Sequence, residues 1–258
     1  MPCLPRACLS CAVRSYLKSH GIMKSLLSLF AILLFSACKT PPEETVQSAG
    51  KDILAVTAQK EMLTAKEVDS TALPVGIVYE GFFKKALRWT DAAGDNLLLL
   101  TEIPPHPTKT ANPEIDYSSD AELYAYHYQL AGGISKNTWK VYDFIKDCPV
   151  DIVAEFVQKE CRVTDLNNNG TAEIWLLYKT VCHGDVSPLE MKIIMYEGPQ
   201  KYALRGENKV QVGTLENGRP QYEGGNYTFD PAFQDGTPAF RQEALEIWNR
   251  NLISTGAE

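Results

Sequence analysis

The chain has 258 residues, 45% of them hydrophobic, and a formal net charge of −7 at pH 7. This length is enough for one sizeable domain with its own core, and the composition excludes long-range disorder. The first 37 residues carry four basic side chains and no acid, so the remainder is more acidic than the whole chain. A surface of that charge excludes nucleic acid as an expected partner.

An export signal is predicted near the N-terminus. Residues 23–38 read MKSLLSLFAILLFSAC, and the apolar stretch 26–35 is shorter than the ~20 residues of a membrane-spanning helix. The last four residues, ending at Cys38, resemble the bacterial lipobox, which implies cleavage before Cys38 and attachment of lipid to it. The alternative is an ordinary secretory signal with a chance cysteine. Met23 is a plausible true start, with residues 1–22 preceding the signal.

The rest of the chain is interpreted as a tether followed by a single domain. Residues 1–37 form the signal region, 38–72 a lipidated tether, and 73–254 one β-rich domain. Short apolar runs between turn residues predict strands in the first half of this domain. The folded part should start at 75–79, the strands are 86–90, 96–100, 122–130 and 138–145, and 151–156 fits a strand or a short helix. Prolines at 104, 105, 107 and 113 exclude a central strand between 102 and 120.

Residues 162–179, RVTDLNNNGTAEIWLLYK, form the clearest strand–turn–strand pattern in the chain. Asn169-Gly170 tolerates the positive φ of a tight hairpin turn. The nearly continuous apolar run at 174–178 is typical of a strand covered on both faces.

The turn in this pattern is rich in oxygen ligands. Oxygen-bearing residues alternate around a glycine, as a hard cation such as calcium requires. The spacing resembles the calcium loops of integrin-type propeller blades, and it differs from an EF-hand, whose twelfth position would be Leu176. The candidate calcium ligands are Asp165, Asn167, Asn169, Thr171 and Glu173. The alternative is a turn whose Asx side chains accept hydrogen bonds from their own backbone. Calcium affinity here would be weak, on the order of millimolar.

The segments around this turn repeat an earlier pattern. Arg88-Trp-Thr-Asp91, a turn and Asn96-Leu-Leu-Leu-Leu correspond to Arg162-Val-Thr-Asp165, a turn and Glu173-Ile-Trp-Leu-Leu. Two further strands follow each copy, the second pair at 191–196 and 201–204. We therefore predict a mainly β (α+β) fold of two blade-like antiparallel β-meanders. Two blades cannot close a propeller, so the sheets should pack face to face or join as one open sheet.

The C-terminal part ends in a predicted helix. Ser187-Pro188 favours one helical turn over 187–190, and 207–236 is rich in glycine and turn residues. Thr237 as cap and Pro238 at the first position then start a helix that closes one side of the sheet. Its apolar face consists of Phe240, Ala244, Ile247, Trp248 and Leu252.

Three cysteines follow Cys38, at positions 148, 161 and 182. Export places them in an oxidising compartment, where a disulfide is expected. A hairpin centred near residue 169 puts Cys161 opposite about Leu177, so we predict a Cys148–Cys182 bond with Cys161 free and buried. The pairing of Cys161 with Cys182 is the second choice.

Two further groups are candidates for ligand contact. Tyr124, Tyr126 and Tyr128 alternate onto one face of their strand, where exposed rings would stack on sugars and half-buried rings would belong to the sheet packing. His183 beside Asp185 could form a ligand cluster, or it is a hydrogen-bonded loop histidine near a disulfide.

Several of these segments together resemble a known family. They are Asp147–Asp151, the 163–173 hairpin, Cys182–Pro188 and Met191–Gly198. They are similar to exported bacterial proteins labelled surface polysaccharide biosynthesis proteins, over about residues 75–252. The label names a process, and the resemblance supports Cys148 and Cys182 belonging to one framework.

We therefore expect a lipid-anchored cell-envelope protein, tethered to the outer membrane on its periplasmic or surface face. It would act as a non-enzymatic binding or assembly component for surface polysaccharide, with calcium as the only candidate cofactor. One alternative is an envelope-glycan hydrolase or transferase, which would gather carboxylates or His183 in a concave pocket. The other is a scaffold for envelope protein partners.

Overall fold

The computed structural model describes residues 63–108 and 117–253. The predicted signal region at 1–37, the lipidation site at Cys38 and the tether up to residue 62 lie outside the described residues. Within those residues, none of the helices has the length and apolar content needed to cross a membrane.

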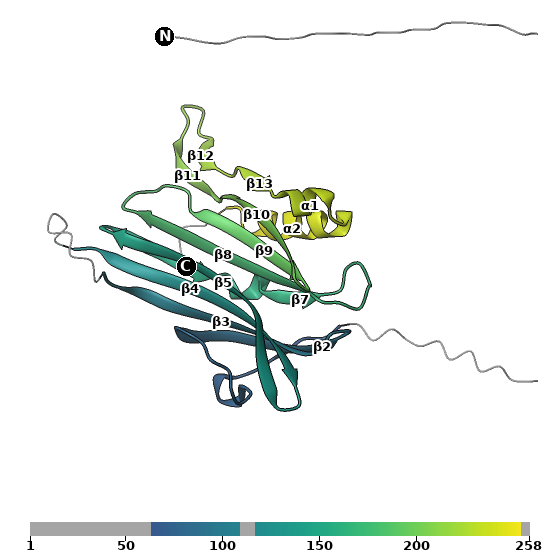
Figure 1. The fold of residues 1–258 in the computed structure, drawn as a ribbon. Helices are drawn as coiled ribbons and strands as arrows, with labels where there is room; N and C mark the ends of the chain where they lie inside the picture. The colour runs from purple at the N-terminus through teal and green to yellow at the C-terminus, as the bar shows by residue number, and fades with distance from the viewer. Residues whose placement is uncertain (1–62, 109–116, 254–258) are drawn as a thin grey trace, which may run out of the picture. The chain divides into compact units, whose positions relative to one another are not determined.

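Two antiparallel sheets make up most of the fold (Figure 1). The strands of the first, sheet A, are β1 (Lys66–Glu67), β2 (Phe82–Asp91), β3 (Gly94–Pro107), β4 (Ser119–Ala131) and β5 (Ile134–Cys148). The strands of the second, sheet B, are β6 (Asp151–Phe156), β7 (Arg162–Thr164), β8 (Glu173–His183), β9 (Glu190–Glu197), β10 (Gln200–Glu207) and β13 (Tyr227–Phe229). Sheet A has the order β1-β2-β3-β4-β5, and sheet B the order β13-β10-β9-β8-β6 with β7 also paired to β8.

The remaining elements are short. They are the 3₁₀ turns η1 (Ser70–Ala72) and η2 (Gln158–Glu160), the hairpin of β11 (Lys209–Thr214) and β12 (Pro220–Gly224), and the helices α1 (Pro231–Asp235) and α2 (Pro238–Arg250). The predicted mainly β fold with a C-terminal helix is confirmed.

Each sheet contains one of the predicted four-stranded meanders. In sheet A the strands β2, β3, β4 and β5 are neighbours in chain order, and in sheet B β7, β8, β9 and β10 are. The two sheets pack face to face, with Leu98 and Leu100 of β3 in the same buried cluster as Leu176 of β8 and Ile194 of β9. Alternating side chains of each strand point to opposite faces, so each sheet has a second face to cover.

The outer faces of the two sheets are covered differently. Helices α1 and α2 pack on sheet B (Figure 1). Their Phe233, Phe240 and Trp248 bury the outward side chains of β8 and β9. Because inward and outward residues of β8 are both buried, the prediction of a strand covered on both faces is confirmed. On sheet A, residues of the 68–77 segment pack over β3 and β4. The fold therefore includes residues that the sequence assigned to the tether.

Several local predictions were wrong. The folded domain starts before residues 75–79, because β1 at 66–67 already pairs with β2 and Val68 and Leu73 pack on sheet A. No helical turn forms at 187–190, where the Asp185 carboxylate instead accepts hydrogen bonds from Ser187. The strand β3 continues through Pro104 and Pro105, because they lie at a bulge beyond the last residue of β3 that pairs with β2.

The C-terminal helix matches its predicted face. Phe240, Ala244, Ile247 and Trp248 are buried. Thr237 precedes the helix but its side chain makes no capping bond, whereas Asp230 caps the preceding helix by accepting from the Phe233 amide.

A buried carboxylate ties this helix to the sheet. Glu160, only 5% exposed, accepts hydrogen bonds from Arg250 and from the Asn251 amide, and it also lies within ion-pair distance of Arg162. Burial alone would raise the pKa of Glu160, but the hydrogen bonds from Arg250 and Asn251 outweigh it, and the pKa lies below its usual value.

We expect Glu160→Ala to reduce the free energy of unfolding by about 1–3 kcal/mol at pH 7, because it removes the shared acceptor of hydrogen bonds from Arg250, Asn251 and Arg162. A lowered folded-state pKa gives stability that is present above the unfolded pKa of ~4.3 and is lost as the pH falls through the folded value. The difference from wild type should therefore shrink towards pH 3. Urea unfolding at the two pH values measures it, with the exposed Glu216→Ala as control; an equal difference at both would contradict the assignment.

Candidate functional site

The predicted oxygen-rich turn is an eight-residue loop, 165–172, between β7 and β8. It is longer than a tight hairpin because Thr164 pairs with Glu173 in the strand register. Asn168 and Gly170 have φ of 58° and 84°, which an asparagine and a glycine adopt most readily.

The side chains of this turn bond to its own backbone. The Asn167 Oδ1 accepts from the Asn169 amide at 3.0 Å, and the Asn169 Oδ1 accepts from the Thr171 amide at 2.7 Å. The Asp165 Oδ2 accepts from the Gly170 amide at 3.2 Å. The Asx-turn alternative is thus present, and each of these bonds leaves an oxygen with further acceptor capacity.

Glu173, the first residue of β8, follows the turn directly and is buried. It is 0% exposed, and its Oε2 accepts from the Thr164 hydroxyl at 2.7 Å and from the Leu166 amide at 2.8 Å. Burial is the main reason that the pKa of Glu173 is raised, and the nearby Asp165 raises it further. The predicted ligands Asp165 and Glu173 are therefore brought to the same turn.

A third carboxylate borders the turn from the neighbouring strand. The Glu197 Oε1 accepts from the side-chain amides of Asn167 and Asn169 at 2.6 and 2.7 Å. Sequence reasoning missed this contact, although Glu197 is the register partner of Glu173. Among the described residues, no group of three His, Cys, Asp or Glu side chains gathers at metal-ligand spacing. A calcium site at this turn stays a prediction.

The turn also contacts the equivalent turn of sheet A. The Ala92 amide donates to the Gly170 carbonyl at 2.8 Å, and the Ala172 amide donates to the Asp91 carboxylate at 3.1 Å. The two turns that the sequence repeat made equivalent therefore meet in space.

An open hollow of about 900 Å³ lies beside this contact. Four of the residues that line it are acids, Glu67, Asp91, Asp95 and Asp165. Three of them are engaged by the fold: Asp91 by amide and indole donors, Asp95 by Arg88, and Asp165 by Gly170. The hollow is concave, but Asp91, Asp95 and Asp165 accept hydrogen bonds that stabilise the turns around it.

The predicted tyrosine row is buried and not an exposed platform. Tyr124, Tyr126 and Tyr128 are each at most 4% exposed. The hydroxyl of Tyr128 donates to the Val78 carbonyl, and that of Tyr126 accepts from the Glu80 amide at 3.0 Å. Their stacking on a sugar is contradicted, because the chain just before β2 covers them.

The ring row continues onto β5, where it becomes exposed. Tyr142 stacks on Tyr124 at 5.0 Å between ring centroids, and Phe144 stacks on Tyr142 at 5.1 Å. Tyr142 and Phe144 are 44% and 45% exposed. We call the four outward residues Lys140, Tyr142, Phe144 and Lys146 the β5 strip. This strip was not predicted from the sequence, although the alternation in KVYDFIK places these four residues on one face of the strand.

Lysine–carboxylate pairs flank the two exposed rings. Lys140 pairs with Glu80 at 2.6 Å and lies over the rings of Tyr124 and Tyr142. Lys146 pairs with Glu122 at 2.6 Å. The β5 strip thus combines apolar rings with charged groups on an edge strand.

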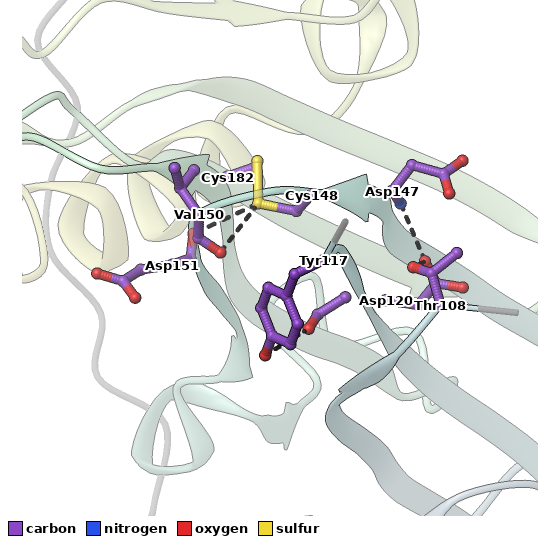
Figure 2. The surroundings of a disulfide bond; sticks show 9 residues. Thr108, Tyr117, Asp120, Asp147, Cys148, Val150, Asp151 and Cys182 are labelled. Carbon is purple, nitrogen blue, oxygen red and sulfur yellow. Dashed lines mark hydrogen bonds between the residues drawn. A yellow bond between two sulfur atoms is a disulfide. The ribbon is translucent and has the colours of Figure 1, made fainter. Parts of the chain in front are cut away.

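The predicted disulfide between Cys148 and Cys182 is present and joins the end of β5 to the end of β8 (Figure 2). Asp120 reinforces this corner: its carboxylate accepts from the Thr108 hydroxyl at 2.5 Å and from the Asp147 amide at 2.9 Å (Figure 2). A disulfide of this kind suggests an extracytoplasmic location.

His183 lies next to this bond without forming a ligand cluster. Its Nδ1 is 3.9 Å from the Asp185 carboxylate, and Asp185 is largely exposed. His183 is the last residue of β8 and not part of a loop, and within the described residues its Nδ1 makes no hydrogen bond, so the loop-histidine prediction is wrong. A role of His183 in ligand contact stays a prediction.

The free cysteine is where the sequence predicted it. Cys161 is buried, with its sulfur 3.8 Å from the Leu177 carbonyl. Burial raises the pKa of the Cys161 thiol to about 12.

Comparisons with models of known protein families, with curated proteins and with solved structures found no match. The fold and the disulfide define the class: a disulfide-containing, two-sheet β protein of an extracytoplasmic compartment.

We expect the Cys161 thiol to be unreactive in the native protein, because reaction needs an accessible thiolate. A thiol-specific chromogenic reagent should find the same number of thiols in wild type and Cys161→Ser under native, non-reducing conditions. In denaturant, wild type should show one thiol more. A native difference between the two proteins would mean that this thiol is accessible.

Proposed function

We propose that this chain is a lipid-anchored protein of the cell envelope that binds a surface polysaccharide through the β5 strip. The exposed pair Tyr142 and Phe144 carries this proposal. Large aromatic side chains left exposed side by side on an otherwise well-packed sheet are typical of interaction surfaces.

The chemistry of the strip fits a glycan. Sugar rings have apolar C–H faces that pack on aromatic rings, and hydroxyls that donate to carboxylates and accept from ammonium groups. Here Tyr142 and Phe144 supply the first kind of contact, and the Lys140–Glu80 and Lys146–Glu122 pairs supply the second. The strip runs along one edge strand, which suits an extended polymer better than a compact metabolite.

The expected location of the protein in the cell supports the same proposal. The disulfide suggests an extracytoplasmic location, and the signal at 23–38 ends in a lipobox-like cysteine. The resemblance to exported surface polysaccharide biosynthesis proteins gives the ligand class. The outer membrane, on its periplasmic or surface face, is the proposed site of attachment.

We expect the double variant Tyr142→Ala/Phe144→Ala to bind surface polysaccharide at least ~10-fold more weakly than wild type, which corresponds to about 1.4 kcal/mol. The loss follows from removing both rings that would pack on sugar faces. Isothermal titration with purified surface polysaccharides and an oligosaccharide array provide the measurement.

Phe82→Ala is the matched control, because Phe82 is an exposed phenylalanine, 66% exposed, at the start of β2 in the same sheet. It should bind as wild type does. Equal losses in control and double variant, or no binding by wild type, would contradict the proposal. Turnover of a glycan by wild type would favour a hydrolase or transferase instead.

We expect Cys38→Ser to move the chain from the membrane fraction to the soluble fraction of the exporting cell. The reason is that a serine hydroxyl is not a substrate for thioether-linked lipid attachment. Cell fractionation with immunodetection measures this shift, and mass spectrometry of the N-terminal peptide detects the lipid. A variant that stays in the membrane fraction would exclude the lipid anchor at this residue.

A further inference from the structure

The turn between β7 and β8 encloses a carboxylate that has no cationic partner in the described part of the chain. Glu173 is 0% exposed. None of the ion pairs formed by lysine or arginine in residues 63–108 and 117–253 reaches it. Its register partner on β9 is another acid, Glu197. Burying an ionised carboxylate without compensation costs several kcal/mol, so such a group needs a positive partner or a proton.

The two oxygens of Glu173 are in different situations. Oε2 accepts from the Leu166 amide and the Thr164 hydroxyl. Oε1 is buried and makes no hydrogen bond among the described residues, although the Asn167 backbone amide also lies close enough to the carboxylate to lower its pKa. Since both donors to Oε2 belong to the start of the turn, the carboxylate is directed into the turn and away from solvent.

Oxygen atoms line the same turn. The side-chain oxygens of Asp165, Asn167 and Asn169 each accept a backbone amide of the turn, and a carboxylate or amide oxygen has two lone pairs. Neither histidine nor cysteine occurs between residues 162 and 179, so the donor set consists of oxygens alone. Such a set suits calcium, and it does not suit zinc or copper.

We infer that this turn binds calcium, with Glu173 Oε1 as the central ligand and with Asp165, Asn167, Asn169 and the Thr171 carbonyl as the others. Two carboxylates with amide and carbonyl oxygens form a variable donor set, which calcium accepts and magnesium, with its strict octahedral geometry, does not. The inference is independent of the proposed glycan contact, since none of these residues belongs to the β5 strip.

Calcium bound in this turn would stabilise the contact between the two sheets. The turn donates to and accepts from the β2–β3 turn through Ala172 and Gly170, which contact Asp91 and Ala92. Fixing the turn therefore fixes the junction of the two meanders. The expected readout is the thermal stability of the whole domain.

The test is thermal unfolding of the full chain after removal of metal with a chelator, followed by addition of calcium chloride or magnesium chloride. With affinity on the order of 1 mM, 10 mM calcium should raise the Tm by about 3–5 °C. Magnesium should raise it by less than about 1 °C. Isothermal titration should detect calcium binding directly. No shift and no heat with 10 mM calcium would overturn the inference.

Glu173→Gln tests the central ligand, because it keeps the size of the side chain and removes its charge. The calcium-induced shift should disappear in Glu173→Gln and remain in Glu207→Gln. Glu207 is the matched control, an exposed acid at the end of β10 in the same sheet. An unchanged shift in Glu173→Gln would overturn the inference.

Asn167→Asp covers the case in which Glu173→Gln fails to fold. It adds a third carboxylate to the donor set, so we expect a Kd for calcium at least severalfold lower. It also places a like charge next to Glu197, so its Tm without calcium should fall and calcium should restore it. An affinity and a shift equal to those of wild type would overturn the inference.

Discussion

The carboxylate of Asp91 joins the two halves of this protein. It accepts hydrogen bonds from the Trp89 indole, the Ala93 amide and the Asn96 side chain within its own hairpin. It also accepts from the Ala172 amide of the other sheet. One residue therefore shapes the β2–β3 turn and fixes the turn of the opposite meander against it. The face-to-face packing of the sheets supplies most of the burial, but this contact sets which ends of the sheets meet.

The repeat in the sequence predicted this arrangement because it repeats both the strand pattern and the turn chemistry. Arg88–Asp91 and Arg162–Asp165 each end in an aspartate that bonds to its own turn. The strands were predicted from period-2 alternation and from the apolar run at 174–178, because burial on one or both faces determines which positions are apolar. The disulfide was predictable for a similar reason: placing the hairpin centre fixed which cysteine faced Leu177, and Cys161 indeed lies against the Leu177 carbonyl.

What the sequence did not predict depends on contacts between distant residues. The tyrosine row of β4 alternates in the same way whether it faces solvent or protein, and the hydroxyl contacts that bury it come from Val78 and Glu80, more than 40 positions away. The same covering segment was predicted as the start of the folded domain, because the polar residues before it do not show that Val68 and Leu73 also pack on sheet A. Pro104 and Pro105 fit within β3 because β2 ends its pairing at Glu102, which is a property of register and not of the local residues.

The same register separates the two surfaces to which roles are proposed. Asp95, at the end of β3 where the two turns meet, is level with Leu130 of β4, which in turn is level with Ser135 of β5. Tyr142 is level with Tyr124, and Tyr124 with Thr101. Tyr142 therefore lies about six strand residues, or ~20 Å along the strand direction, from the junction of the turns. At that separation a cation at Glu173 would make no direct contact with a glycan on Tyr142 and Phe144. It would act on that surface only through the stability of the sheets, so each role can be tested without disturbing the other.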